Sequence, residues 1–156
     1  MLFVRPSRLQ PYVAQLAGQL AEHGLTAVCG PLVGGAFVAL TVAQELDVEF
    51  CYSSFTGTAY EIRSGVAPML RGQRVAVVDD AVNAGSAVLS TVAALEAAGA
   101  RLAAVGALVA LDSAVHKIGA STGVPVEHLA ALPATLWAVV DCPLCSTGTP
   151  LDPPPS

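Results

Sequence analysis

The strongest constraint on the fold comes from one segment, Arg74-Val-Ala-Val-Val-Asp79, which is apolar on both faces. A strand of this kind is typical of the interior of a parallel sheet, where helices cover both sides. A helix-length segment over Ser86 to Ala98 follows it, Gly99 ends that segment, and a second apolar strand runs from Leu102 to Leu111. Strands that alternate with helices in this way predict right-handed βαβ units, and therefore an α/β fold with a parallel sheet flanked by helices.

The same alternation extends toward the N-terminus and weakens beyond Asp112. Residues 53 to 72 lack periodicity, and a connection of that length is usually a functional lid or a mobile loop. The other expected elements are a helix from a Ser7 cap to about His23 with Pro11 in its first turn, a strand over 26–29, a helix over 36–46, a strand over 48–52, a helix near 126–132 and a short strand near 136–140.

Composition limits the class of protein. The chain has 156 residues, 54% of them hydrophobic, which predicts a single domain over residues 1–145 followed by a disordered tail over 146–156. Its net charge is −5 and it has no basic stripe, so nucleic acid is not an expected partner. No apolar run is long enough to cross a membrane. Four cysteines are too few for a disulfide scaffold, so we expect a reduced, cytoplasmic protein.

The chemistry is concentrated in Val77-Val-Asp-Asp-Ala-Val-Asn-Ala-Gly-Ser-Ala87, where a strand ends in two carboxylates and a glycine-containing loop opens a helix at Ser86. Backbone N–H groups from Asn83 to Ala87 would form a cradle for a phosphate at the positive end of that helix. Asp79 and Asp80 are placed to hold ribose hydroxyls or a divalent metal one sugar away. The alternative is a solvated Asp-Asp turn in which Gly85 only relieves a tight bend, but the order of strand, acids, loop and helix favours a binding site.

Two other phosphate motifs are absent. The chain has no Gly-x-x-x-x-Gly-Lys run, and its only lysine, Lys117, follows no glycine loop. A Gly-x-Gly-x-x-Gly fingerprint is also missing. These absences argue against a P-loop nucleotidase and against a dinucleotide-binding fold.

The segment Asp79–Ala87 resembles the phosphoribosyl-pyrophosphate (PRPP) motif of type I phosphoribosyltransferases, and most closely the version in orotate phosphoribosyltransferases. Gly30-Pro-Leu-Val-Gly-Gly35 is similar to the pyrophosphate loop that follows the first core strand in that family. The resemblance covers residues of about 8 to 112. It implies a type I phosphoribosyltransferase-like sheet with a short or missing hood over the base.

The resemblance also implies roles for individual residues. Asp79 and Asp80 would hold the ribose hydroxyls, and they would meet Mg²⁺ mostly through substrate oxygens and water. Pyrophosphate would lie against Leu32, Val33, Gly34 and Gly35, and the 5′-phosphate against Asn83, Ala84, Gly85, Ser86 and Ala87. The implied reaction is displacement of pyrophosphate by a nitrogen of a base, through an oxocarbenium-like transition state.

Several positions depart from the orotate pattern. Ser53 and Ser54 stand where an Arg-Lys pair is expected, and Ser113 replaces the arginine that clamps the orotate carboxylate, which puts orotate itself in doubt. The stretch from Tyr52 to Arg63 contains no lysine or histidine, so Arg63 is the one cation there that could reach pyrophosphate in catalysis. A solvated loop arginine is an equally supported interpretation.

Two functions therefore stay open: an enzyme that uses PRPP and a base, and a PRPP-binding sensor or regulator that has lost catalytic cations. The resemblance favours the enzyme. The apolar helix over 36–46 predicts a homodimer in which a loop of one subunit covers the site of the other. Cys142 and Cys145 supply only two of the four ligands of a structural zinc site, so a reduced cysteine turn is favoured over zinc.

Overall fold

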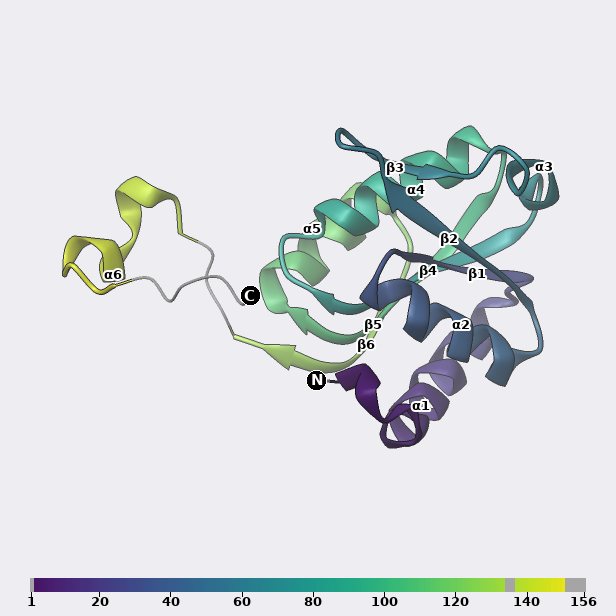
Figure 1. The fold of residues 1–156 in the computed structure, drawn as a ribbon, viewed down its shortest axis with the longest axis horizontal. Coiled ribbons are helices and arrows are strands. Elements are labelled where there is room, and N and C mark those ends of the chain that lie inside the picture. The colour runs from purple at the N-terminus through teal and green to yellow at the C-terminus, as the bar shows by residue number, and fades with distance from the viewer. Residues whose placement is uncertain (1, 134–136, 151–156) are drawn as a thin grey trace.

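The computed structural model describes residues 2–133 and 137–150 and contains a six-stranded sheet in the order β3-β2-β1-β4-β5-β6 (Figure 1). Neighbouring strands are parallel except β2 and β3, which form an antiparallel pair. The predicted α/β class with a parallel sheet is confirmed. The strands are β1 (Ala27–Pro31), β2 (Glu49–Phe55), β3 (Tyr60–Ile62), β4 (Arg74–Val82), β5 (Arg101–Leu111) and β6 (Val126–Leu132).

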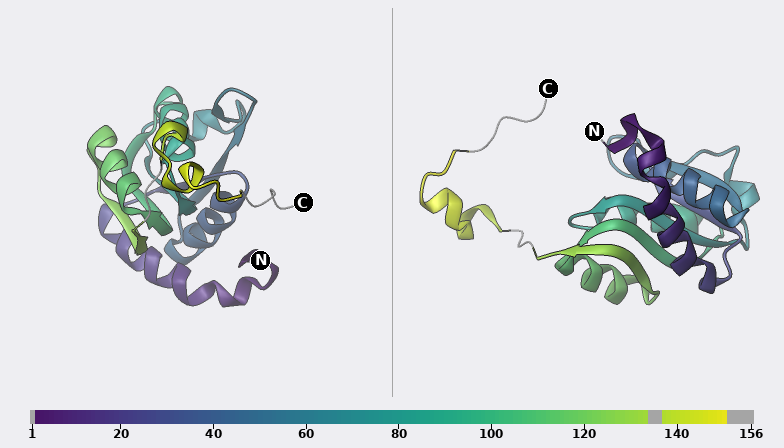
Figure 2. Two further views of the ribbon diagram at one scale, coloured as in Figure 1. Left: turned by 90° about the vertical axis from the view of Figure 1, so that its left-hand side faces the viewer. Right: turned by 90° about the horizontal axis from the view of Figure 1, so that it is seen from below.

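Helices cover both faces of the sheet (Figure 2). The α-helices are α1 (Gln10–Leu20), α2 (Gly34–Leu46), α3 (Ala67–Leu70), α4 (Ser86–Ala97), α5 (Asp112–Thr122) and α6 (Pro143–Ser146). Short 3-10 turns are η1 (Leu2–Val4), η2 (Pro6–Arg8), η3 (Ala21–His23) and η4 (Val139–Asp141).

Strand β4 supplies the core on both sides of the sheet, as its sequence predicts. Val75 and Val77 pack with residues of α4 and α5, whereas Ala76 and Val78 pack with residues of α1 and α2. All four side chains are fully buried. Each Å² of apolar surface that is buried contributes about 25 cal/mol of stabilisation, so a strand buried on both faces is a main source of stability. The carboxyl end of β4 is thereby fixed between two helical layers.

Three expectations from the sequence are wrong. Residues 126–132 form strand β6 instead of a helix, because the edge of β5 offers a parallel partner from Val105 to Leu111. Residues 53–72 contain the end of β2, β3 and α3 instead of one long loop. The Ser7 cap is also not made, since α1 begins after Leu9 with no side-chain cap, although Pro11 does lie in its first turn.

The C-terminal segment lies apart from the sheet (Figures 1 and 2). The strand expected near 136–140 falls partly outside the described residues, and Val139 and Val140 belong to η4. Of the predicted tail, residues 151–156 also lie outside them. No helix within the described part of the chain is both long and apolar enough to cross a membrane.

Candidate active site

Two carboxylates stand at the end of β4, near the carboxyl edge of the sheet. Asp79 is buried, with 8% of its surface exposed, and Asp80 is half-buried. The backbone N–H of Asp80 donates a hydrogen bond of 2.9 Å to Asp79 Oδ1. Within residues 2–133 and 137–150, no Lys, Arg or His forms a salt bridge with either acid. This pair of carboxyl groups therefore has no cationic partner from the described protein.

The environment of Asp79 favours its protonated form. Burial, together with a side-chain hydrogen bond to the neighbouring Asp80 carboxyl and repulsion from its charge, raises the pKa of Asp79 from 3.8 to about 7. A ligand that brings a cation or hydroxyl donors to this carboxylate would favour ionisation instead. The arrangement suits a site that is completed by its substrate.

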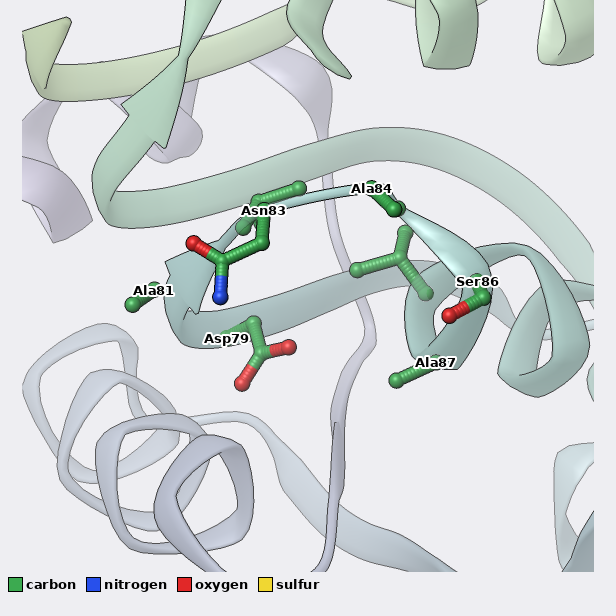
Figure 3. A pocket seen from close by; sticks show the side chains of 9 residues that line it. Asp79, Ala81, Asn83, Ala84, Ser86 and Ala87 are labelled. Atoms are coloured by element: carbon green, nitrogen blue, oxygen red, sulfur yellow. The ribbon is translucent and has the colours of Figure 1, made fainter. Parts of the chain in front are cut away.

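The loop after β4 surrounds a cavity of about 160 Å³ (Figure 3). The Asn83 amide points toward the Asp79 carboxylate, and Ser86 lies at the far end of the loop, where the helix begins. Gly85 adopts a left-handed φ of 76°, a conformation that favours glycine. It precedes the first turn of α4, which has no side-chain cap, so the N-terminal amides of α4 are available to an anion. The cavity is lined by Asp79, Ala81, Val82, Asn83, Ala84, Gly85, Ser86, Ala87 and Val88.

The start of α2, where the short loop from β1 ends, packs directly against the two acids. A Cβ atom on Gly34 would overlap the Asp80 carboxylate, and a Cβ on Gly35 would lie 2.5 Å from Asp79 Oδ1. Only glycine allows this approach at both positions. The segment predicted to hold pyrophosphate, Leu32–Gly35, and the predicted ribose-binding acids are thus brought together by the fold. The peptide bond between Leu32 and Val33 is cis.

Ser53 ties this loop to helix α4. The Leu32 N–H donates a 2.8 Å hydrogen bond to the Ser53 carbonyl, and the Ser53 hydroxyl lies 2.7 Å from the Thr91 hydroxyl. Both hydroxyl residues are completely buried. Ser53 is therefore a structural link instead of an exposed ligand, and a cation at this position would be buried without a partner.

The structure does not bring Arg63 together with the acids. Strand β3 is separated from β4 by β2 and β1, and it runs antiparallel to β2, so the chain leaves the carboxyl edge before it reaches Arg63. The turn at that edge, residues 56–59, contains no cation. Arg63 itself is exposed.

The cysteines fall into two different environments. Cys29 and Cys51 lie side by side on β1 and β2 and are buried, as their apolar surroundings predict. Cys142 Sγ accepts a hydrogen bond of 3.3 Å from the Cys145 N–H in the C-terminal segment. No group of three or more metal-ligating side chains occurs in the ranges that the structure describes.

Helix α5 makes two contacts with the loop over 83–87, the predicted phosphate loop, that the sequence did not indicate. The Lys117 ammonium donates a 3.3 Å hydrogen bond to the Ala84 carbonyl. The Ile118 side chain packs so closely on Gly85 that an added Cβ there would meet it at 3.0 Å. The weak periodicity after Asp112 hid this helix, although Ala114 and Ile118 are both buried at a helical spacing of four residues.

Comparison with known proteins gives a consistent family. A model of the phosphoribosyl transferase domain matches residues 8–120. The orotate phosphoribosyltransferase of Thermotoga maritima is 32% identical over 146 residues, which are 91% of this chain and 73% of that protein. The orotate phosphoribosyltransferase of Caldanaerobacter subterraneus subsp. tengcongensis is 29% identical over 155 residues, or 99% of this chain and 79% of that protein.

Solved structures show the same fold. The orotate phosphoribosyltransferase of Aeropyrum pernix aligns with a TM-score of 0.65 and 25% identity, over 81% of this chain and 71% of that one. The adenine phosphoribosyltransferase of Thermoanaerobacter pseudethanolicus aligns with a TM-score of 0.68 and 20% identity, over 81% and 82% of the two chains. The second likeness is one of fold alone.

Proposed function

This chain belongs to the phosphoribosyl transferase family, and from that premise we propose that it transfers the phosphoribosyl group of PRPP to a nitrogenous base and releases pyrophosphate, in nucleotide synthesis or salvage. The observation that carries the proposal is the close packing of Gly34 and Gly35 on the Asp80 and Asp79 carboxylates. It joins a loop suited to pyrophosphate to a pair of acids suited to ribose, and Asp79 also lines the cavity at the start of α4.

Each part of the substrate has a proposed partner. The amides of Asn83 to Ala87, together with the Ser86 hydroxyl, hold the 5′-phosphate in the cavity after β4. Asp79 and Asp80 accept hydrogen bonds from the ribose hydroxyls. The backbone of Leu32 to Gly35 binds the pyrophosphate. A sugar fixed at both ends presents its anomeric carbon to the incoming base in one orientation.

The donor set fits Mg²⁺. Two adjacent carboxylates without a cationic partner among the described residues offer the oxygen ligands that Mg²⁺ prefers, and Mg²⁺ commonly keeps water and substrate phosphate oxygens as its other ligands. When bound, the ion neutralises charge on the pyrophosphate. The protein's own contribution would be to bind and orient the sugar, with Asp79 and Asp80 accepting the hydrogen bonds of its hydroxyl groups.

Several bases are candidates for the acceptor of the phosphoribosyl group. Similarity to proteins named orotate phosphoribosyltransferase makes orotate one candidate. Positions where a cation was expected carry serine instead. Ser53 is buried against Thr91 and Ser113 is exposed, and neither residue has the positive charge that would recognise a carboxylate. We therefore keep uracil, adenine, guanine and xanthine as candidates beside orotate. All four cysteines are free, which agrees with the cytoplasmic location that we propose.

One observation favours the alternative function, a PRPP-binding sensor or regulator. The β2–β3 turn carries no cation, and Arg63 lies away from the acids, so a catalytic role for Arg63 stays a prediction. Sensor and enzyme share the binding site but differ in turnover.

Calorimetric titration of PRPP into the protein, with and without Mg²⁺, tests the site. We expect Mg²⁺-dependent binding that the Asp80→Asn and Gly85→Val variants lose while remaining folded. Absence of binding in both conditions would remove the proposed function. A pyrophosphate-release assay with the five bases then separates the two alternatives, because only an enzyme turns over.

A further inference from the structure

Lys117 is the only lysine of the chain, and it contacts the rim of the proposed phosphate cavity. Its ammonium group donates to the carbonyl of Ala84, a residue that lines the cavity. The side chain is exposed to solvent. An ammonium has three N–H donors, and the bond to Ala84 uses one of them.

The position of Lys117 is fixed by the packing of helix α5. Ile118, the next residue, is fully buried and fills the space against Gly85. This contact seats α5 directly on the phosphate loop and brings Lys117 to the adjacent peptide. The Lys117 ammonium therefore lies beside the Ile118–Gly85 contact that shapes the loop.

The charge balance of the site gives this cation a function. Asp79 and Asp80 place negative charge beside a cavity that must accept a phosphate, and the chain as a whole carries −5. Backbone amides supply partial charges only. A full positive charge at the rim lowers the electrostatic cost of bringing in a phosphate dianion, and solvent ions screen this effect because the group is exposed.

We propose that Lys117 is a phosphate-binding determinant of this protein, acting through its charge on the 5′-phosphate of the ribose ligand at the Asn83–Ala87 loop. This inference rests on the proposed function, because it assumes that the 5′-phosphate occupies that loop. It assigns to α5 a role in binding that neither the sequence motif nor the family comparison supplies.

The test measures the affinity of PRPP and of ribose 5-phosphate, with Mg²⁺, for the wild-type chain and for Lys117→Gln, Lys117→Arg and Arg101→Gln. Gln can still donate a hydrogen bond to the Ala84 carbonyl but carries no charge. Arg101 is the first residue of β5, so it lies at the amino ends of the parallel strands, away from the cavity, and it is exposed. Arg101→Gln therefore removes an equal charge far from the cavity.

We expect Lys117→Gln to weaken both ligands by about three- to tenfold at low salt, with Lys117→Arg and Arg101→Gln close to wild type. The affinity of the wild type should also fall more steeply with NaCl than that of Lys117→Gln, a difference that a merely structural hydrogen bond would not produce.

Equal affinity and equal salt dependence in wild type and Lys117→Gln would overturn the role of Lys117, provided that Gly85→Val abolishes binding. An equal loss in Lys117→Gln and Arg101→Gln would also overturn it, because the effect would then be one of net charge. If the wild type binds neither ligand, the proposed function fails together with this inference.

Discussion

Asp79 combines deep burial with a proposed role in binding ribose hydroxyls or Mg²⁺ that its ionised form serves best. Its pKa is raised from 3.8 to about 7 by burial and by Asp80, so the stability that its protonated form contributes is complete below about pH 4 and is lost as the pH rises through 7. We therefore expect the free protein to lose on the order of 2 kcal/mol of stability between pH 5 and pH 8 through this group. Asp79→Asn should abolish that part of the loss while it prevents PRPP binding.

Denaturant unfolding at pH 5 and pH 8 measures this effect. Asp141→Asn, at an exposed position in η4, is the control and should follow the wild type. A decline with pH in Asp79→Asn that equals the wild-type decline would show that the burial of Asp79 does not govern the pH dependence. Stability would then have no link to the charge of this site.

Gly34 offers a second test at the scale of one residue. Gly34→Ala places a methyl group on the Asp80 carboxylate, so one of the two must move. We expect PRPP affinity to fall at least tenfold, with a cost to folding of about 1–3 kcal/mol. Gly18→Ala is the matched control, because its Cβ would meet nothing within 4 Å and helix α1 should gain up to about 1 kcal/mol. Unchanged PRPP affinity in Gly34→Ala would contradict the joint site.

At the scale of elements, the Ser53–Thr91 bond connects β2, the pyrophosphate loop and α4. Thr91→Val keeps the shape of the side chain but leaves the Ser53 hydroxyl buried without a partner, which should cost about 1–3 kcal/mol. The double variant Ser53→Ala with Thr91→Val removes both hydroxyls and should recover part of this loss. Urea unfolding of the wild type, Ser53→Ala, Thr91→Val and the double variant measures the coupling, and strictly additive changes would show that the two hydroxyls act independently.

The elements also show what can be predicted from sequence. Strand β4 and helix α4 were predictable because their apolar residues face two covered sides or one packed face, a pattern that local spacing expresses. Val126 to Leu132 contains Leu and Ala, which favour a helix, but the open edge of β5 determines its conformation. Strand β3 and its hairpin with β2 were likewise hidden, because β3 has only three residues and depends on pairing with Ser53 to Phe55.

The site likewise has parts that the local sequence predicts and parts that depend on the tertiary fold. Asp79, Asp80 and the loop over 83–87 form a contiguous motif, so their proximity was readable from the chain. The packing of Gly34 on Asp80 depends on strands β1 and β4 being neighbours in the sheet. From the sequence, only the resemblance to type I phosphoribosyltransferases indicated that these two segments serve one site. Lys117 reaches the loop through α5, and no local pattern links residues 84 and 117.

At the scale of the whole molecule, we propose a homodimer formed through the exposed face of α2. Phe37 and Leu40 are 48% and 47% exposed, and with Phe3 and Pro6 they line an apolar surface hollow. Large exposed apolar patches of this kind commonly mark interaction sites. Since α2 begins at Gly34, a partner on this face would lie near the pyrophosphate loop.

Light scattering after size exclusion tests the homodimer. Phe37→Glu and Leu40→Glu together should convert a dimer to a monomer, because two carboxylates per subunit would enter an apolar interface. Leu144→Glu, at an exposed position of α6, adds a charge outside this face and should leave the mass unchanged. PRPP affinity of the monomer then gives the functional consequence, since a site that one chain completes should bind as before and a shared site should bind weakly. A monomeric wild type would show that the α2 face is not a self-association surface.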